Sequence, residues 1–326
     1  MGLTCSAPGR AGIIGNPTDM YGGSVISCSL QERATVSLQE SDRLILETDG
    51  DQRILASPDE FELQGDHFDI ARAVLIGMNA TDLKVHIAWK TDIPFQAGLS
   101  GSTSLLVATL SAISTYRGTR YSRYHMAELA RMIEYRHLGV FCGYQDAYMC
   151  TFGGLNYMDF RGKEFHQEFG SDPLATIEPL MSYVPVVPLI LVNTEARKVS
   201  GKVHRPIRER WLEGDREVIE AYQEVETLAR AGKRAVLNGQ WDELGRMMNE
   251  NHRISSAIGG SSPEDDQMIQ LARDHGALGA KLAGSGGTVI VLHPEPDGLI
   301  VKLKNSGAKS FMKPTPNPGV EIEDQS

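Results

Sequence analysis

The sequence has few of the features that mark several classes of protein. Its 326 residues include only four cysteines, Cys5, Cys28, Cys142 and Cys150. They form no C-x-x-C pair and have no histidine cluster nearby, so neither structural zinc nor a disulfide framework is expected. The longest apolar run, 184–192, has nine residues and contains two prolines, whereas a helix that spans a bilayer needs about 20. There is no internal repeat, no low-complexity block and no signal-peptide pattern.

The sequence also has fewer basic residues than acidic ones. Lys and Arg together number 32 against 42 Asp and Glu, which gives a net charge of −10 at pH 7. Such an acidic chain is not expected to bind nucleic acid or an anionic membrane surface. With 41% hydrophobic and 23% charged residues, the composition is typical of a packed globular protein. We therefore expect a soluble, cytoplasmic protein, monomeric or homodimeric, that holds anionic ligands through local features.

Hydrophobic periodicity predicts an N-terminal part in which strands come first and helices follow. Strands are expected over 25–30, 34–38, 83–89 and 155–160. Helices are expected directly after a Gly/Ser loop at 98–104, over about 122–138, and in a short segment between Gly143 and Gly153. This order predicts that the Gly/Ser loop joins a strand to the beginning of a helix.

The second half has a different pattern. Strands are expected over 188–192 and 288–292, and helices over about 215–239, 241–251 and 264–276. Helices segregated from strands in this way indicate an α+β fold. Prolines cluster at 179–188, so we divide the chain into domains 1–184 and 185–326. The tail from Lys313 is rich in proline and glycine, and we expect it to be loosely ordered.

Two glycine-rich loops are candidates for binding phosphate. The first opens a helix and consists of Gly98, Leu99, Ser100, Gly101, Ser102, Thr103 and Ser104. A helix N-terminus attracts anions, and glycine lets the backbone approach them closely. The second precedes an apolar strand and contains Gly284, Ser285, Gly286 and Gly287. Each loop alone also fits a plain helix cap or a tight turn. Their presence in one chain favours a shared phosphate site, although no Walker-type motif occurs.

Two further groups of residues are candidates for binding a polyol and for holding a metal ion or accepting a proton. The turn-forming segments 7–10 and 15–23 carry Arg, Asn and Asp, which supply the paired donors and acceptors that sugar hydroxyls need, although turn chemistry alone would also explain them. Glu134 and Asp146 lie twelve positions apart, where one carboxylate could hold Mg²⁺ and the other accept a proton. Acidic residues are abundant here, so the pair alone is weak evidence.

Taken together and in this order, these motifs resemble the GHMP kinase superfamily, which includes galactokinases, homoserine kinases and mevalonate kinases. Within that superfamily the plant-type glucuronokinases are the most similar. Gly15-Asn16-Pro17-Thr18-Asp19 resembles their Gly-Asn-Pro-Ser-Asp, and Gly98-Leu99-Ser100-Gly101-Ser102 matches their loop. Segments 153–160, 200–204 and 210–215 are similar as well. The resemblance implies a two-domain fold with an N-terminal domain like domain 2 of ribosomal protein S5 and a ferredoxin-like C-terminal domain.

The resemblance also implies a role for each matching residue. Asp146 would be the catalytic aspartate and Arg10 the cation beside it. Ser102 and Glu134 would ligate Mg²⁺, and the two glycine-rich loops would surround the phosphates of ATP. The implied sugar contacts are Asn16, Asp19, Tyr21 and Gly154. Galactokinases carry Glu at the position of Asn16, which disfavours galactose.

The activity implied by the resemblance is transfer of the ATP γ-phosphoryl group to the anomeric hydroxyl of a sugar, with D-glucuronate as the expected acceptor. A uronate carboxylate needs a cationic partner. The basic run 202–210 offers Lys202, Arg205, Arg208 and Arg210, although such a run can also be a solvated helix start. Three alternatives remain open: a kinase of another sugar or small alcohol, a sugar and ATP sensor without catalysis, and a decarboxylase of the mevalonate type.

Overall fold

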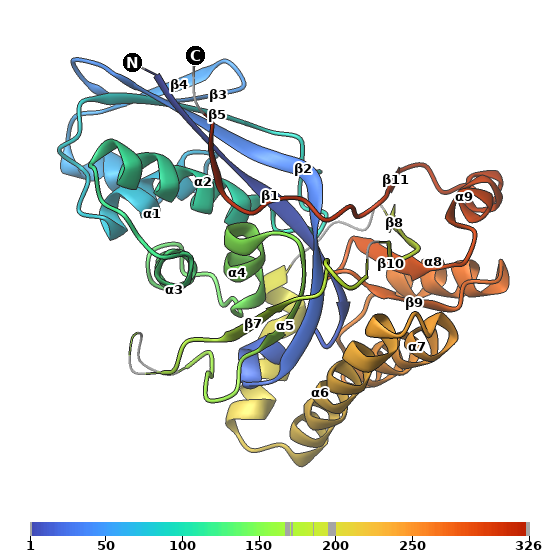
Figure 1. Cartoon of the computed structure of the whole chain (residues 1–326). Coiled ribbons are helices and arrows are strands. Elements are labelled where there is room, and N and C mark those ends of the chain that lie inside the picture. The colour runs from blue at the N-terminus through green and yellow to red at the C-terminus, as the bar shows by residue number, and fades with distance from the viewer. Residues whose placement is uncertain (1, 167–169, 171, 185, 195–199, 324–326) are drawn as a thin grey trace.

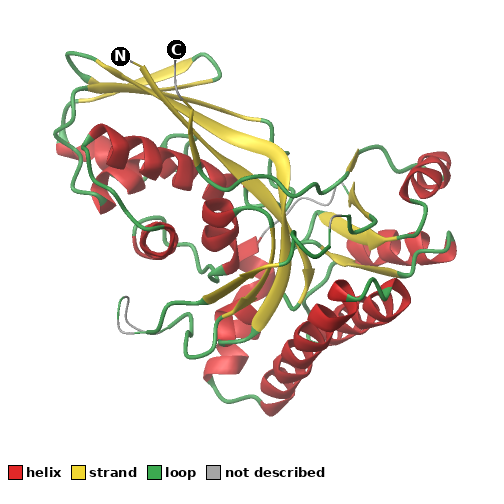
Figure 2. Cartoon of the chain, in the orientation of Figure 1, coloured by secondary structure: helices red, strands yellow, loops and turns green. Residues whose placement is uncertain are grey.

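The computed structural model describes residues 2–166, 170, 172–184, 186–194 and 200–323, without the side chains of 200–205. It contains two β-sheets, each covered by helices (Figures 1 and 2). The larger sheet has eight strands and the smaller has four. In the described residues no helix combines the length and the apolar character needed to cross a membrane.

The larger sheet is built on two long antiparallel strands, β1 (Gly2–Ile14) and β2 (Ser24–Glu40). Its strand order is β12-β1-β2-β5-β3-β4, and β6 and β7 extend it from β2. The bounds of the remaining strands are β3 Leu44–Thr48, β4 Asp51–Leu55, β5 Val85–Thr91, β6 Leu155–Asp159, β7 Thr176–Pro179 and β12 Glu321–Glu323.

Four helices lie on one side of this sheet (Figure 1). They are α1 (Asp69–Gly77), α2 (Gly101–Tyr116), α3 (Arg123–Arg136) and α4 (Gln145–Phe152). Val36, Ile87 and Leu106 are fully buried in the cluster between the helices and the sheet. Burial of this apolar surface fixes α2 and α4, and thereby the loops that precede them.

The smaller sheet has the strand order β11-β8-β10-β9. Its strands are β8 Leu189–Asn193, β9 Gly279–Leu282, β10 Thr288–Leu292 and β11 Phe311–Met312. The helices of this second half of the chain are α5 Ser200–Leu212, α6 Arg216–Leu237, α7 Trp241–Ala257, α8 Pro263–Asp274 and α9 Pro296–Asn305. In α6 the buried residues recur every three or four positions, at 218, 222, 225, 229, 232 and 236, which is the period of a helix with one apolar face.

One hydrophobic cluster is shared by the two sheets. It includes Ile13 of β1 and Ile26 of β2, together with Leu191 of β8, Val236 of α6 and Ile290 of β10. The expected boundary at 184/185 separates the strands of the larger sheet from those of the smaller sheet. The exception is β12, which belongs to the larger sheet but follows the boundary. As a division into domains it stays a prediction.

Three expectations need correction. The strands expected over 25–30 and 34–38 form one strand, β2, because β1 pairs with it across two irregularities of register. The segment 7–10, interpreted as a turn, lies inside β1, where a register shift between Pro8 and Arg10 accommodates the proline. Over its described residues, 313–323, the tail is held to the larger sheet and is not loosely ordered: Arg33 donates hydrogen bonds to Asn317 Oδ1 and to the carbonyls of Pro318 and Gly319.

Candidate active site

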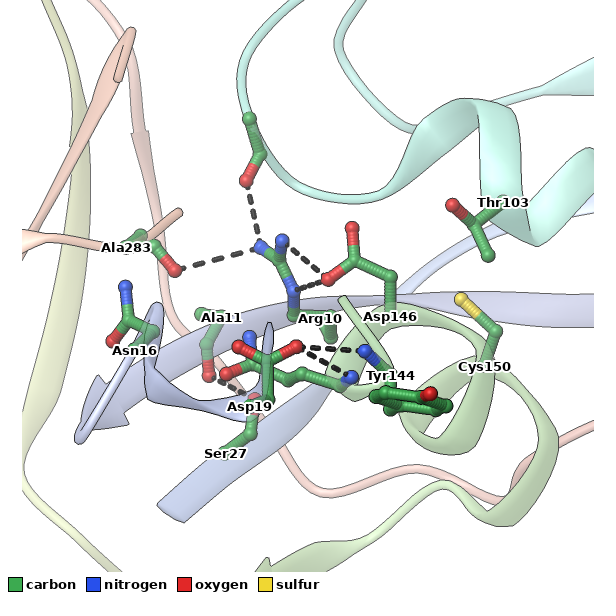
Figure 3. Close-up of polar contacts among 12 residues, drawn as sticks. Arg10, Ala11, Asn16, Asp19, Ser27, Thr103, Tyr144, Asp146, Cys150 and Ala283 are labelled. Atoms are coloured by element: carbon green, nitrogen blue, oxygen red, sulfur yellow. Dashed lines mark hydrogen bonds and ion pairs between the residues drawn. The ribbon is translucent and has the colours of Figure 1, made fainter. Parts of the chain in front are cut away.

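The centre of the site is an ion pair between Arg10, in the middle of β1, and Asp146, in the first turn of α4 (Figure 3). Arg10 Nε donates to Asp146 Oδ1 at 2.8 Å, and Arg10 Nη2 lies 2.7 Å from the same oxygen. Arg10 is buried, whereas the Asp146 side chain is 31% exposed. The pair therefore presents a carboxylate that a ligand can reach, held in place by a rigid cation.

Asp19 lies beside this pair and is itself buried (Figure 3). Its Oδ2 accepts hydrogen bonds from the backbone N–H groups of Tyr144 and Gln145, at 2.8 and 2.9 Å. Burial raises the pKa of Asp19 to about 6, against the opposing effect of the Gln145 N–H, and the charge of Asp146 raises it further. A side chain at Gly143 would collide with Asp19 Oδ2, so the close approach of Asp19 to α4 requires glycine there.

The segment that carries Asp19 also carries Asn16. Asn16 is buried, and its Oδ1 accepts a hydrogen bond of 2.6 Å from Lys281 Nζ on β9. Gly15 N, next to it, donates to Asn251 Oδ1 of α7 at 2.9 Å. The first sheet, the second sheet and α7 therefore jointly position this part of the site.

The two glycine-rich loops are in direct contact with each other, as the shared-site hypothesis requires. Gly98 has a φ of +73°, and a side chain there would collide with the carbonyl of Gly286. A Cβ at Gly284 would likewise collide with the carbonyl of Gly98 and lie 2.9 Å from Arg10 Nη1. Arg10 Nη1 itself donates to Gly98 O at 2.7 Å. Both loops therefore border the Arg10–Asp146 pair.

The first loop has the features of an anion site. It leads into the N-terminus of α2, a helix of 16 residues, and the end of such a helix attracts negative charge. Ser100 adopts the left-handed conformation at the N-cap, and its buried Oγ has no hydrogen-bond partner in the described part of the chain. A buried hydroxyl without a partner is costly, and a phosphate oxygen would satisfy it.

The expected magnesium ligands lie next to this loop. Glu134 is buried, and both of its carboxylate oxygens accept from Thr103 Oγ1 at 3.1 Å. Ser102, the expected hydroxyl ligand, is exposed on the same first turn of α2. Oxygen ligands of this kind fit Mg²⁺, which takes one or two carboxylates and completes its shell with phosphate oxygens and water. No group of three or more acidic, histidine or cysteine side chains suited to a metal occurs among the described residues.

The last two predicted sugar contacts differ in their positions. Tyr21 is stacked on Tyr222, with ring centroids 4.5 Å apart, and is part of an aromatic cluster that also contains Trp211. Burial raises the pKa of Tyr21, and the nearby charge of Asp19 adds to this rise, so Tyr21 lies close to the site. Gly154 follows α4, at the opposite end from Asp146, and its N–H and carbonyl bond to the C-terminal tail and to Ser29. Because α4 has eight residues, at about 1.5 Å per residue, the structure does not bring Gly154 to the site.

Lys281 is the site residue whose role the sequence does not reveal. The motif 281–288 begins with it, but glycines define the motif, and a lysine inside a short apolar strand has no periodic signal. Asp265 of α8 was not predicted either. Its Oδ1 accepts from Gly287 N at 3.2 Å and from Thr194 Oγ1 at 2.8 Å, which fixes the second loop. No motif marks it, because it lies 22 residues before Gly287 in the sequence.

Family models match three parts of the chain. The N-terminal domain of GHMP kinases matches residues 69–154, the C-terminal domain of GHMP kinases matches residues 233–308, and the galactose-binding signature of galactokinases matches residues 2–40. The chain belongs to the GHMP kinase family and has its two-domain fold. Kinases of this family use ATP as the phosphate donor.

Individual relatives agree with this classification. Glucuronokinase 1 of Arabidopsis thaliana is 30% identical over 323 residues, covering 92% of this chain and 88% of the relative. Mevalonate kinase of Methanothermobacter thermautotrophicus is 26% identical and covers 88% of each chain. The crystal structure of Lactococcus lactis galactokinase complexed with galactose has a TM-score of 0.79 and covers 98% of this chain and 95% of its own, at 18% identity. These findings support sugar kinase activity.

Proposed function

We propose that the protein transfers the γ-phosphoryl group of ATP to the anomeric hydroxyl of D-glucuronate, giving D-glucuronate 1-phosphate and ADP. The observation that carries this proposal is the Arg10–Asp146 pair, which lies directly beside both glycine-rich loops. The choice of acceptor is supported by the similarity to glucuronokinase 1 over most of both chains.

The geometry of Asp146 suits it to receive a proton. Both contacts from Arg10 fall on Oδ1, and Oδ2 forms no hydrogen bond with any described residue. Arg10 therefore orients the carboxylate and leaves one oxygen for the sugar hydroxyl. As the sugar oxygen bonds to the γ-phosphorus, the bond from that phosphorus to the bridging oxygen breaks and ADP leaves. The hydroxyl proton passes to Asp146 Oδ2. Such base catalysis contributes roughly 10²- to 10⁴-fold to the rate.

The remaining requirement of phosphoryl transfer is positioning and charge neutralisation. The backbone of 98–104, the N-terminus of α2 and the Ser100 hydroxyl would hold the phosphates. The Arg10 guanidinium is close enough to balance the charge that develops in the transition state. Ser102 and Glu134 would supply oxygen ligands to Mg²⁺, which neutralises phosphate charge when it is bound.

A neutral hexose is the second candidate acceptor. The match of residues 2–40 to the galactose-binding signature favours it. Asn16, however, stands where galactokinases carry Glu, and an amide offers a donor that an ionised carboxylate does not have. This difference favours an acceptor with more negative charge at that position.

The test of the catalytic role is Asp146→Asn. This change keeps the size of the side chain and removes the base, so we expect turnover at saturating substrate to fall by roughly 10²- to 10⁴-fold while ATP still binds. Asp297→Asn is the matched control, because Asp297 is highly exposed on α9 and pairs only with Lys313 in the described structure. Near wild-type turnover by Asp146→Asn would remove Asp146 from its role.

The test of the substrate is ADP release with ATP and Mg²⁺ over D-glucuronate, D-galacturonate, D-glucose, D-galactose, D-mannose and mevalonate. Phosphorus NMR of the product identifies an anomeric phosphate. The expected result is that glucuronate is turned over far more efficiently than any other acceptor. More efficient turnover of a neutral sugar would replace the acceptor but keep the mechanism. Binding of sugar and ATP without ADP release would indicate a sensor, and release of carbon dioxide from a mevalonate diphosphate would indicate a decarboxylase.

A further inference from the structure

Lys281 is a buried cation that has only neutral oxygens as partners. It lies on β9 and is 2% exposed. Its Nζ donates to Asn16 Oδ1 and to the backbone carbonyl of Leu282, both at 2.6 Å. No carboxylate of a described residue lies within 4 Å of it. Burial, together with the charge of Arg10, lowers the pKa of Lys281 to about 7.

A second buried lysine in the same chain shows what is unusual about Lys281. Lys163 is fully buried, and its Nζ lies 2.9 Å from Glu128 and 2.6 Å from Asp172. That arrangement is the general one, because a charge removed from water is costly unless an opposite charge accompanies it. Lys281 therefore lies in a place where an anion would be stabilised and where the described chain does not supply one.

The space beside Lys281 is lined with unused hydrogen-bond donors. A cavity of about 20 Å³ is bordered by residues of β9, α6 and α7 and of the segment after β1. Because lysine can only donate, the amide oxygen of Asn16 must face Lys281, so its NH₂ group is left to donate elsewhere. The Ser255 oxygen accepts from Asn251 Nδ2 at 3.3 Å, so its O–H is also available. The cavity therefore suits an acceptor-only group such as a carboxylate. Its lining includes Asn16, Tyr222, His252, Ser255, Lys281 and Gly284.

The cavity lies next to the reacting centre. Gly284 borders the cavity, and a Cβ on Gly284 would be 2.9 Å from Arg10 Nη1. Asn16, which also borders the cavity, comes three residues before Asp19 in the chain. At about 20 Å³ the cavity is on the scale of one water molecule, which is too small for a sugar ring and suited to the polar end of one.

We propose that Lys281, together with the amide group of Asn16 and the hydroxyl of Ser255, forms the subsite that binds the carboxylate of an anionic sugar. This inference rests on the proposed function and names the residues that select a uronate over a neutral hexose. The cation that pairs with the sugar carboxylate is then Lys281 on β9 and not a residue of the basic run 202–210.

The basic run 202–210 contains one other candidate for the cation that pairs with the sugar carboxylate. Arg210 is already paired with Asp215 and Glu217, at 2.7 and 2.6 Å. The side chains of Lys202 and Arg205 lie outside the described residues. Arg208 is buried, and its guanidinium carbon lies 3.6 Å from the ring centroid of Phe141. Arg208 is therefore the matched comparison for Lys281.

The experiment compares Lys281→Met with Arg208→Met. For each variant and the wild type, kcat/KM is measured with D-glucuronate and with D-glucose, and KM is measured for ATP. We expect Lys281→Met to lower kcat/KM for glucuronate by about 10- to 100-fold, mainly through KM, because a hydrogen bond to a charged group is lost. The value for glucose should fall much less than the value for glucuronate, the KM for ATP should stay unchanged, and Arg208→Met should keep the preference for glucuronate.

The outcomes separate the two proposals. If the wild type prefers glucuronate and Lys281→Met keeps that preference, the subsite is wrong and the proposed function stands. If Arg208→Met loses the preference instead, the partner is Arg208. If the wild type does not phosphorylate glucuronate, the proposed function fails and the subsite with it. Unfolding in urea checks the fold of each variant, and Lys281→Gln, which keeps a donor without the charge, carries the same comparison if Lys281→Met does not fold.

Discussion

At the scale of single residues, the burial of Asp19 links the site to pH. Its carboxylate sits against the N-terminus of α4 and faces Arg10 and Asp146, and its pKa is raised to about 6. Above that pH the ionised group can accept hydrogen bonds from a sugar with its second oxygen. Below it the group is neutral and one of its oxygens becomes a donor.

We therefore expect kcat/KM for the sugar to fall as the pH drops through about 6, because Asp19 takes up a proton there. In Asp19→Asn this fall of kcat/KM at acidic pH should disappear, and kcat/KM at neutral pH should be lower than in the wild type. The measurement is kcat/KM for the sugar from about pH 5 to pH 8. An identical fall at acidic pH in both proteins would assign it to another group.

The same raised pKa has a consequence for stability. The folded state holds the proton of Asp19 more tightly than the unfolded state does, so this contribution to stability is complete below the ordinary pKa of 3.8 and is lost as the pH rises from there through about 6. Asp19→Asn should therefore gain stability relative to the wild type at about pH 8 and gain little below about pH 4, as measured by urea unfolding. An equal difference at both pH values would contradict this expectation.

At the scale of elements, the contact between the two glycine-rich loops is what brings the phosphate site to the catalytic pair. Gly284 is the point of closest approach, since a Cβ there would collide with the Gly98 carbonyl and press on Arg10 Nη1. A displaced Arg10 would release Asp146 from its fixed orientation.

Gly284→Ala should accordingly lower kcat by at least about 10-fold, because small displacements in a reacting geometry are costly, and raise the KM for ATP. Gly298→Ala is the control: it lies in α9, where the nearest atom to a new Cβ is 3.8 Å away, and alanine favours a helix. Steady-state kinetics of both variants checks this, and unchanged kinetics of Gly284→Ala would show that the loops can separate without loss.

Helices and motifs were predictable where local signals are strong. The periodicity of α6 and α7 and the Ser122 cap of α3 lie in contiguous residues. Strand pairing was less predictable. The residues Pro8 and Gly9 of β1 locally indicate a turn, but β1 is extended because it pairs with β2 and because its backbone bonds to the carbonyl of Leu99. Both partners are distant in the sequence. Arg10 and Asp146 were predicted to lie together through the resemblance of their motifs, and they form an ion pair, whereas the position of Gly154 depends on the far end of α4.

At the scale of the whole molecule, the C-terminal segment returns to the first sheet. β12 pairs with β1, opposite Thr4 to Ser6. Arg33 of β2 binds the segment through Asn317, Pro318 and Gly319. A side chain at Gly319 would collide with the Thr151 carbonyl, so the segment also lies tightly against the end of α4.

Arg33→Met should therefore lower the free energy of unfolding by about 2–3 kcal/mol, since several partly buried hydrogen bonds are worth about 1 kcal/mol each. Arg246→Met is the control, because Arg246 is largely exposed and pairs with Glu243 one turn away on α7. Urea unfolding measures both. A loss in Arg33→Met no larger than in the control would mean that the segment contributes nothing to stability.

The pairing of β12 with β1 also sets an order of events during synthesis. β1 leaves the ribosome before β12, which emerges about three hundred residues later. Until then the outer edge of β1 around Thr4 to Ser6 has no neighbouring strand, and an unpaired edge can pair with another chain. The nascent protein thus depends on β12 to cover the edge of β1, and premature termination shortly before residue 321 would leave that edge open.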